Sequence, residues 1–333
     1  MEYRSRKAQK AKRRDSKEEK KAPYRVRFPA SFSLTENPEG VLASFRKIQG
    51  KNIKFTWVGL NLSSVTEVGQ GAVAYLLSIV GRLRERLPNI RISITWPREP
   101  NAFDELMSIG LGSYVHTKYD GGEFSGDTFR VREGTLGFDD NLKELMDFIE
   151  VHLHSGEDND IDSLLKGLRT SFLECRENAI RHAYQGLPKH SSAGSASAPG
   201  GPSVSSRPLR WWLVASIEPS SGDVLVSILD QGHGIPNTVH IKKTENIMNA
   251  VPGLRLQDSQ LLESALNGEG RSQSRLDHRG SGLPWVREQA ETEAQIGDLV
   301  VVSGRGYYRV NQGLKEMASV IKGTLFSWRI KQK

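Results

Sequence analysis

The sequence has a single cysteine and no long apolar run, and each absence excludes a class of protein. Cys175 has no second cysteine to pair with, which excludes an intrachain disulfide and favours a reducing compartment. No apolar stretch approaches the roughly 18 residues that cross a bilayer. The charged start of the chain also lacks the apolar segment of a signal peptide. We therefore expect a soluble, cytoplasmic protein with no membrane partner.

The basic charge is concentrated at the N-terminus. Residues 1–21 carry ten Lys/Arg and four Asp/Glu, and so account for almost all of the net charge of +7. The sequence predicts a basic disordered tail over 1–23, because this stretch has no core-forming periodicity. Such a tail could contact nucleic acid by charge alone, or it could be a solubilising arm.

Residues 24–116 alternate strand-like and helix-like segments, which predicts a layered α/β domain. Asn37 followed by Pro38 is typical of a helix start. We expect strands over 24–34, 53–65 and 89–96, and helices over 38–49, 71–87 and 102–111.

A glycine-rich stretch, 117–127, predicts a linker to a second unit over 128–333. Low-complexity residues 186–207 predict a flexible loop in that unit. Trp211 and Trp212 begin a strand and are expected to be core and interface residues rather than platforms for base stacking. We expect helices over 141–154 and 161–184, and strands over 210–218, 224–230, 299–310 and 323–330.

Three polar side chains recur four residues apart in the second of these helices. Glu174, Asn178 and His182 would therefore lie on one helix face. The oxygen of Asn178 could ligate Mg²⁺, which prefers oxygen ligands, and Glu174 could polarise a water molecule. His182 could equally make a structural hydrogen bond, and Cys175 is expected to be a buried thiol.

Two glycine motifs follow this helix. Asp230 ends a strand and is followed by Gly232 and Gly234, which permit a tight turn and close backbone approach. Gly280 and Gly282 precede a predicted helix start, where backbone N–H groups bind anions. The chain contains no Walker A sequence.

The segment between the glycine motifs ends in basic residues punctuated by glycine. We expect a movable lid over about 237–280, although an ordinary surface loop would have the same composition.

The ordered series E-x-x-x-N-A-x-x-H-A, D-x-G-x-G-I, G-S-G-L and G-T resembles the GHKL (histidine-kinase-like, Bergerat-type) ATPase superfamily over roughly 128–332. The resemblance implies an α/β (α+β) sandwich that binds Mg-ATP. Arg279 departs from the family pattern, because a glycine would stand there. The implied roles are a general base at Glu174, a Mg²⁺ ligand at Asn178, an adenine contact at Asp230 assisted by Thr324, and a pocket and phosphate lid shaped by Gly232, Gly234, Gly280, Gly282 and Leu283.

The run from Asn61 to Ala72, NLSSVTEVGQGA, resembles the core motif of the STAS (anti-sigma-factor-antagonist-like) domain. The phosphorylatable serine of that family falls at Gln70 or Gly71, so this copy has no acceptor there. We therefore interpret the N-terminal domain as a degenerate STAS-like docking or sensing module.

Three functions stay open at this point. The first is an Mg-ATP-dependent regulatory enzyme of the anti-sigma-factor kinase type, which hydrolyses ATP or transfers its γ-phosphoryl group to a serine or threonine of a protein partner. The second is a non-catalytic module in which ATP controls a protein interaction. The third and weaker one is a nucleic-acid-associated ATPase that uses residues 1–21. The residues do not fix the oligomeric state, and a homodimer is compatible with all three.

Overall fold

The fold is described from a computed structural model of the full chain. The described residues are 23–49, 56–115, 128–134, 139–153, 160–181, 210–239, 256–269 and 282–332.

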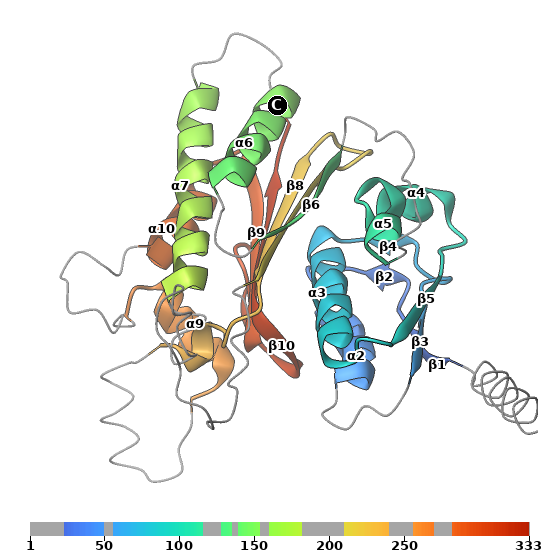
Figure 1. Ribbon diagram of the computed structural model, residues 1–333. Helices are drawn as coiled ribbons and strands as arrows, with labels where there is room; N and C mark the ends of the chain where they lie inside the picture. Colours follow the sequence, from blue (N-terminus) through green and yellow to red (C-terminus); the bar gives the residue numbers. More distant parts are fainter. Residues whose placement is uncertain are drawn as a thin grey trace, which may run out of the picture.

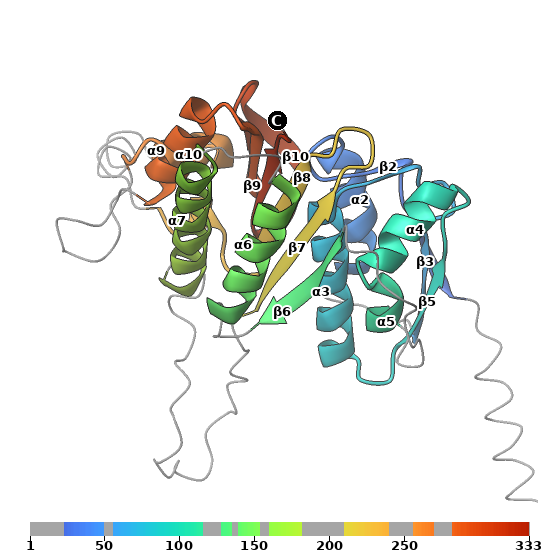
Figure 2. The ribbon, with the colours of Figure 1, turned by 90° about the horizontal axis from the view of Figure 1, so that it is seen from above.

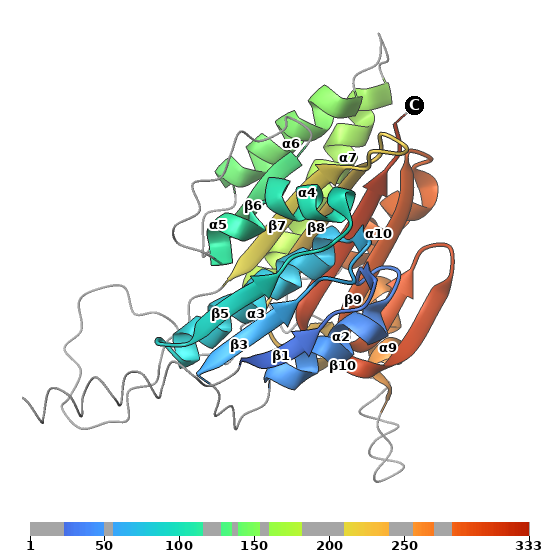
Figure 3. The same ribbon diagram turned by 90° about the vertical axis from the view of Figure 1, so that its right-hand side faces the viewer.

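The N-terminal part contains a small parallel sheet in the order β1-β3-β5, which forms one outer layer of the molecule (Figure 3). The expected mixture of α and β elements is confirmed, although the strand expected over 24–34 is divided in two. The elements are β1 (Tyr24–Arg27), β2 (Ser31–Phe32), α2 (Pro38–Gln49), β3 (Trp57–Asn61), β4 (Glu67–Val68), α3 (Gln70–Arg86), β5 (Arg91–Thr95), α4 (Pro100–Ser108) and α5 (Leu111–Val115).

The predicted start of α2 is confirmed. Asn37 Oδ1 accepts a hydrogen bond from Gly40 N at 3.2 Å, and Pro38 is the first helical residue. Helix α3 is apolar on nearly all sides, and its residues from Gln70 to Gly81 are all buried. A helix of this kind belongs between two layers.

The second part is built on a five-stranded antiparallel sheet in the order β6-β7-β8-β10-β9. The hairpin expected between the strands at 210–218 and 224–230 is confirmed. β9 and β10 are longer than expected, and β6 was not predicted. The strands are β6 (Thr128–Gly134), β7 (Trp211–Ile217), β8 (Val224–Asp230), β9 (Ile296–Arg309) and β10 (Gly313–Ile330).

One face of this sheet is covered by helices from the same part of the chain (Figure 1). Phe172 of this helical layer packs edge-on against Trp328 of β10, with ring centroids 4.9 Å apart. The helices are α6 (Asp139–Leu153), α7 (Asp160–Arg181), α9 (Asp258–Leu266) and α10 (Gly282–Thr292), and a short 3-10 turn, η1 (Ile235–Asn237), follows β8.

The opposite face of the same sheet is covered by α2 and α3 (Figures 1 and 2). Gly71 of α3 approaches the sheet so closely that a β-carbon there would lie 2.7 Å from Leu325 Cδ2. One continuous hydrophobic cluster joins the N-terminal part to this face and includes Trp212, Val214, Leu229 and Val302. The order of layers is therefore helices, antiparallel sheet, helices and parallel sheet.

Part of the predicted lid is packed into this fold. Within 237–280 lies α9, whose Leu262 and Leu266 are buried against the helical face of the sheet. The expected tail apart from Pro23, the linker and the loop over 186–207 lie outside the described residues. Among the helices that are described, none is long and apolar enough to cross a membrane.

Candidate functional site

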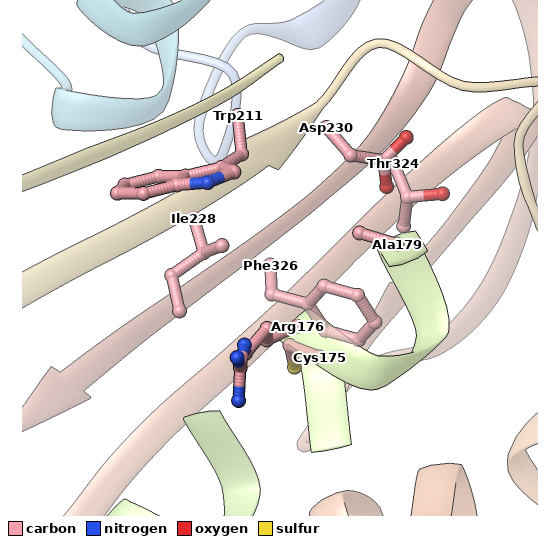
Figure 4. Close-up of a pocket in the computed structure, with 8 residues that line it drawn as sticks. All are labelled: Cys175, Arg176, Ala179, Trp211, Ile228, Asp230, Thr324 and Phe326. Atoms are coloured by element: carbon pink, nitrogen blue, oxygen red, sulfur yellow. The ribbon is translucent and has the colours of Figure 1, made fainter. Parts of the chain in front are cut away.

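A pocket opens between helix α7 and strands β7, β8 and β10 (Figure 4). The empty space within and above it amounts to about 320 Å³, part of which is open solvent. Its walls are mainly apolar, and its polar groups lie at the two ends. The lining residues are Cys175, Arg176, Ala179, Trp211, Ile228, Asp230, Thr324 and Phe326.

Strand register brings the polar end of the pocket together. Trp211 of β7 is the direct cross-strand partner of Asp230 at the end of β8. Leu325 of β10 pairs with Leu229, so Thr324 and Asp230 are the next residues along two neighbouring strands. Three residues far apart in sequence therefore form one row across the sheet, and Figure 4 shows the side chains of Asp230 and Thr324 beside each other.

Asp230 is a buried carboxyl group at this end. It is 4% exposed, and its Oδ1 accepts a hydrogen bond from Gly232 N at 2.7 Å. Burial raises the pKa of Asp230 to about 6, although hydrogen bonds from Gly232 and Thr324 and the charge of Arg82 oppose the rise. Asp230 is thus an ionised acceptor at neutral pH in a largely apolar site.

The turn after Asp230 depends on close backbone approach. Gly234 has φ +81°, and a β-carbon on it would lie 3.2 Å from Gly323 O. Gly323 has φ +91°, and its β-carbon would lie 1.9 Å from Asp230 O. The sequence reasoning gave Gly234 a role in the turn but named Gly323 only as the residue before Thr324. The close approach of Gly323 to Asp230 lets Thr324 lie against that carboxyl group.

Ser303 of β9 fixes this junction and was missed by the sequence reasoning. Its fully buried hydroxyl accepts from Ile235 N at 2.8 Å and lies 3.3 Å from Gly323 O and 3.0 Å from Thr324 Oγ1. Ser303 therefore joins the glycine turn to the strand that carries Thr324. Only its place in an apolar strand could have drawn attention to it.

Glu174 and Gly282 meet at the start of α10. A β-carbon on Gly282 would lie 2.2 Å from Glu174 Oε2, so the carboxylate occupies the space that any larger residue would need. Asn178, one turn further along α7, is half-buried, as is Glu174 itself. Leu283 packs against the core of the helical layer. Two motifs about one hundred residues apart thus meet beside the pocket.

Of the predicted site residues, Asp230 and Thr324 line the pocket, whereas Glu174, Asn178 and Gly282 are not among its lining residues. Cys175, one residue after Glu174, lines the same pocket as Asp230 and Thr324. Cys175 is buried as expected, and burial raises the pKa of its thiol. His182, Arg279 and Gly280 lie outside the described residues.

Trp211 lines the pocket, although the sequence predicted only a core and interface residue at this position. It is 7% exposed and does belong to the core, but its indole also borders the pocket (Figure 4). Its neighbour Trp212 faces the other side of the sheet and is fully buried. The alternation of strands separates the two tryptophans.

The two positions expected for a STAS phosphoacceptor are covered. Gln70 is 4% exposed, and its Nε2 donates to Ser216 Oγ of β7 at 2.6 Å and to Glu105 Oε1 at 3.1 Å. Gly71 lies against Leu325 of β10. This segment is part of the contact between α3 and the sheet.

No group of three or more His, Cys, Asp or Glu side chains in the described part of the chain could hold a metal ion. A hard cation beside the pocket would need the oxygen of Asn178 together with oxygens supplied by a ligand.

Comparisons with models of protein families, with curated proteins and with solved structures found no match to this chain.

Proposed function

We propose that this protein binds Mg-ATP in the pocket under α7 and that it is a GHKL-type ATPase or serine/threonine protein kinase. The observation that carries the proposal is the pairing of buried Asp230 with Thr324 at one end of a pocket whose walls are mainly apolar. This arrangement suits a flat apolar ring with one polar edge, and adenine is such a ring.

The base would be held by its polar edge. Asp230, ionised at neutral pH, accepts a hydrogen bond from an exocyclic amine, and the hydroxyl of Thr324 adds a second polar contact. Ile228, Phe326 and Trp211 supply apolar surface to the ring faces. In a base that has a carbonyl oxygen in place of the amine, that oxygen would face the carboxylate of Asp230. Both groups are hydrogen-bond acceptors, so no hydrogen bond could form between them.

The phosphates would lie toward α10. The N-terminus of this helix begins at Gly282, and exposed backbone N–H groups at such a terminus attract anions. Asn178 would contribute its amide oxygen to the Mg²⁺ that accompanies ATP, and the bound ion would neutralise phosphate charge. Asn178 is half-buried and lies one helical turn beyond Glu174.

Glu174 would act on the nucleophile. Its carboxylate can accept a proton from water or from a serine or threonine hydroxyl as either attacks the γ-phosphorus. The contact with Gly282 places that carboxylate at the start of α10. The same residue would therefore serve hydrolysis and phosphoryl transfer, and the acceptor would decide between them.

One observation favours a second candidate, a non-catalytic ATP-gated module. A carboxylate at a helix N-terminus also stabilises the helix by interaction with its dipole. Glu174 beside Gly282 would have this role even without turnover. ATP would then change a partner surface by binding alone.

Incubation with γ-labelled ATP, with and without cell lysate, separates hydrolysis, transfer and binding alone. Under the enzymatic proposal, Glu174→Gln keeps ATP binding and lowers turnover by at least about 100-fold, because a general base is removed. Glu288→Gln, an exposed glutamate of α10, is the matched control and should turn over like wild type. Equal turnover in Glu174→Gln and wild type would show that Glu174 is not the general base, and the absence of turnover in both would leave only the gated module.

Asn178→Ala tests the metal part of the proposal. It should remove the Mg²⁺-dependent component of ATP affinity and leave the Mg²⁺-independent component. Retention of the full Mg²⁺ effect would show that Asn178 is not a ligand.

A further inference from the structure

Strand β10 contains a bulge immediately before Thr324. Ile321 is opposite Gly304 of β9, whereas Thr324 is opposite Ser303, so two residues of β10 lie between consecutive partners. A bulge takes its extra residues out of the regular ladder. The backbone N–H groups of Lys322 and Gly323 therefore need stabilising contacts from outside the β9–β10 pair.

Helix α3 of the N-terminal part supplies one such contact. Lys322 N donates to the hydroxyl oxygen of Tyr75 at 3.3 Å. Tyr75 is fully buried, and the same oxygen accepts from Gln49 Nε2 at 2.7 Å. Its ring packs edge-on against Phe45, with centroids 5.0 Å apart. The hydroxyl is thus held in place by two N-terminal helices.

The other side of the same bulge faces the pocket. Gly323 lies against Asp230 O, and Thr324 hydrogen-bonds with Asp230. Ser303 holds Gly323 O and Thr324 Oγ1 from β9. A shift of the bulge toward or away from α3 would therefore move Thr324 relative to Asp230.

We propose that Tyr75 is a positioning residue of the nucleotide pocket, through which the N-terminal part fixes the Asp230–Thr324 pair. The inference rests on the proposed ATP site and extends it to a residue that does not touch the ligand. It makes the N-terminal part a component of base recognition. Because coupling between two sites is reciprocal, ATP binding also stabilises the packing of α3 on the sheet.

The test compares Tyr75→Phe with Tyr307→Phe in the full chain. Each substitution removes one hydroxyl that joins the N-terminal part to the sheet, since Tyr307 Oη donates to Thr35 O at 2.7 Å. Only Tyr75 contacts the bulge. Tyr307→Phe thus controls for a general loosening of the interface.

Calorimetry with Mg-ATP and with Mg-ITP, which lacks the exocyclic amine, supplies the readout. We expect Tyr75→Phe to raise the Kd for ATP about fivefold, in line with the loss of one part-buried hydrogen bond that holds the bulge. The Kd for ITP should change little, so discrimination between the two nucleotides falls about fivefold. Tyr307→Phe should keep wild-type discrimination.

Each outcome decides one point. Wild-type discrimination in Tyr75→Phe would overturn the inference, and so would an equal loss in both variants. If the wild-type chain binds no ATP, the proposed function is wrong, and the inference falls with it. Thermal unfolding without nucleotide shows that both variants are folded.

Discussion

The two faces of the central sheet use the same strands for different purposes. On β7, β8 and β10, one face lines an open pocket, and the other is filled by α3. Adjacent residues divide between them: Trp211, Asp230 and Thr324 face the pocket, whereas Trp212, Leu229 and Leu325 belong to the cluster under α3. A shift of one residue in register would exchange these roles.

The difference shows what each face requires. The face under α3 is closely packed: Gly71 lies against Leu325, and Gln70 donates a hydrogen bond to Ser216. The pocket face keeps a buried carboxyl group, Asp230, whose pKa is raised by burial even though hydrogen bonds from Gly232 and Thr324 and the charge of Arg82 oppose the rise. Such a group costs stability unless a ligand uses it.

The largest expected effect is on ATP affinity, and substitutions at two neighbouring residues, one on each face of the sheet, test it. Asp230→Asn should weaken Mg-ATP binding by about 100-fold, because a charged acceptor for the base amine is lost. Leu229→Ala should lower the free energy of unfolding by about 2–5 kcal/mol through a core cavity, with the Kd for ATP nearly unchanged. Calorimetry and denaturant unfolding of both variants measure this.

The same pair of variants can break the comparison. If Leu229→Ala weakens ATP binding as much as Asp230→Asn does, the two faces of the sheet do not have separate functions.

Asp230→Asn itself should not destabilise the unliganded fold near pH 7. The folded-state pKa of Asp230 is raised, so the native protein binds more protons than the unfolded chain, and the wild type loses stability as pH rises through about 6.

The next effect is a pH dependence of ATP affinity. With a pKa of about 6, Asp230 is ionised at pH 7.5 and mostly protonated at pH 5, so the Kd for ATP should rise about tenfold between them. ITP shares the triphosphate titration but lacks the amine, and serves as the control. Parallel pH profiles for the two nucleotides would show that Asp230 does not read the base.

The smallest effect uses the single thiol as a reporter of the pocket face. Cys175 lines the pocket and is 3% exposed, so alkylation should be slow. ATP at five times its Kd should slow it a further sixfold, roughly as site occupancy dictates. Rates followed by mass spectrometry, with ITP at the same concentration as a control, test this. Protection by neither nucleotide would place them outside the pocket.

The sequence predicted most helices and strands, because helix starts and turns depend on residues that are close together in the chain. Asn37 and Pro38 start a helix wherever they lie, and the glycine turn after Asp230 follows from backbone freedom. The strand order β8-β10-β9 is not local, and neither is the bulge before Thr324. The sequence predicted the same role for Trp211 and Trp212, because the two faces of the sheet on which they lie become different only when α3 packs on one of them.

The most direct test is a crystal structure of the protein with Mg²⁺ and a non-hydrolysable ATP analogue. We expect the base between α7 and the sheet, its exocyclic amine within hydrogen-bond distance of Asp230, and the phosphates near Gly282. An analogue bound elsewhere, with the space between Asp230 and Phe326 empty, would contradict this expectation.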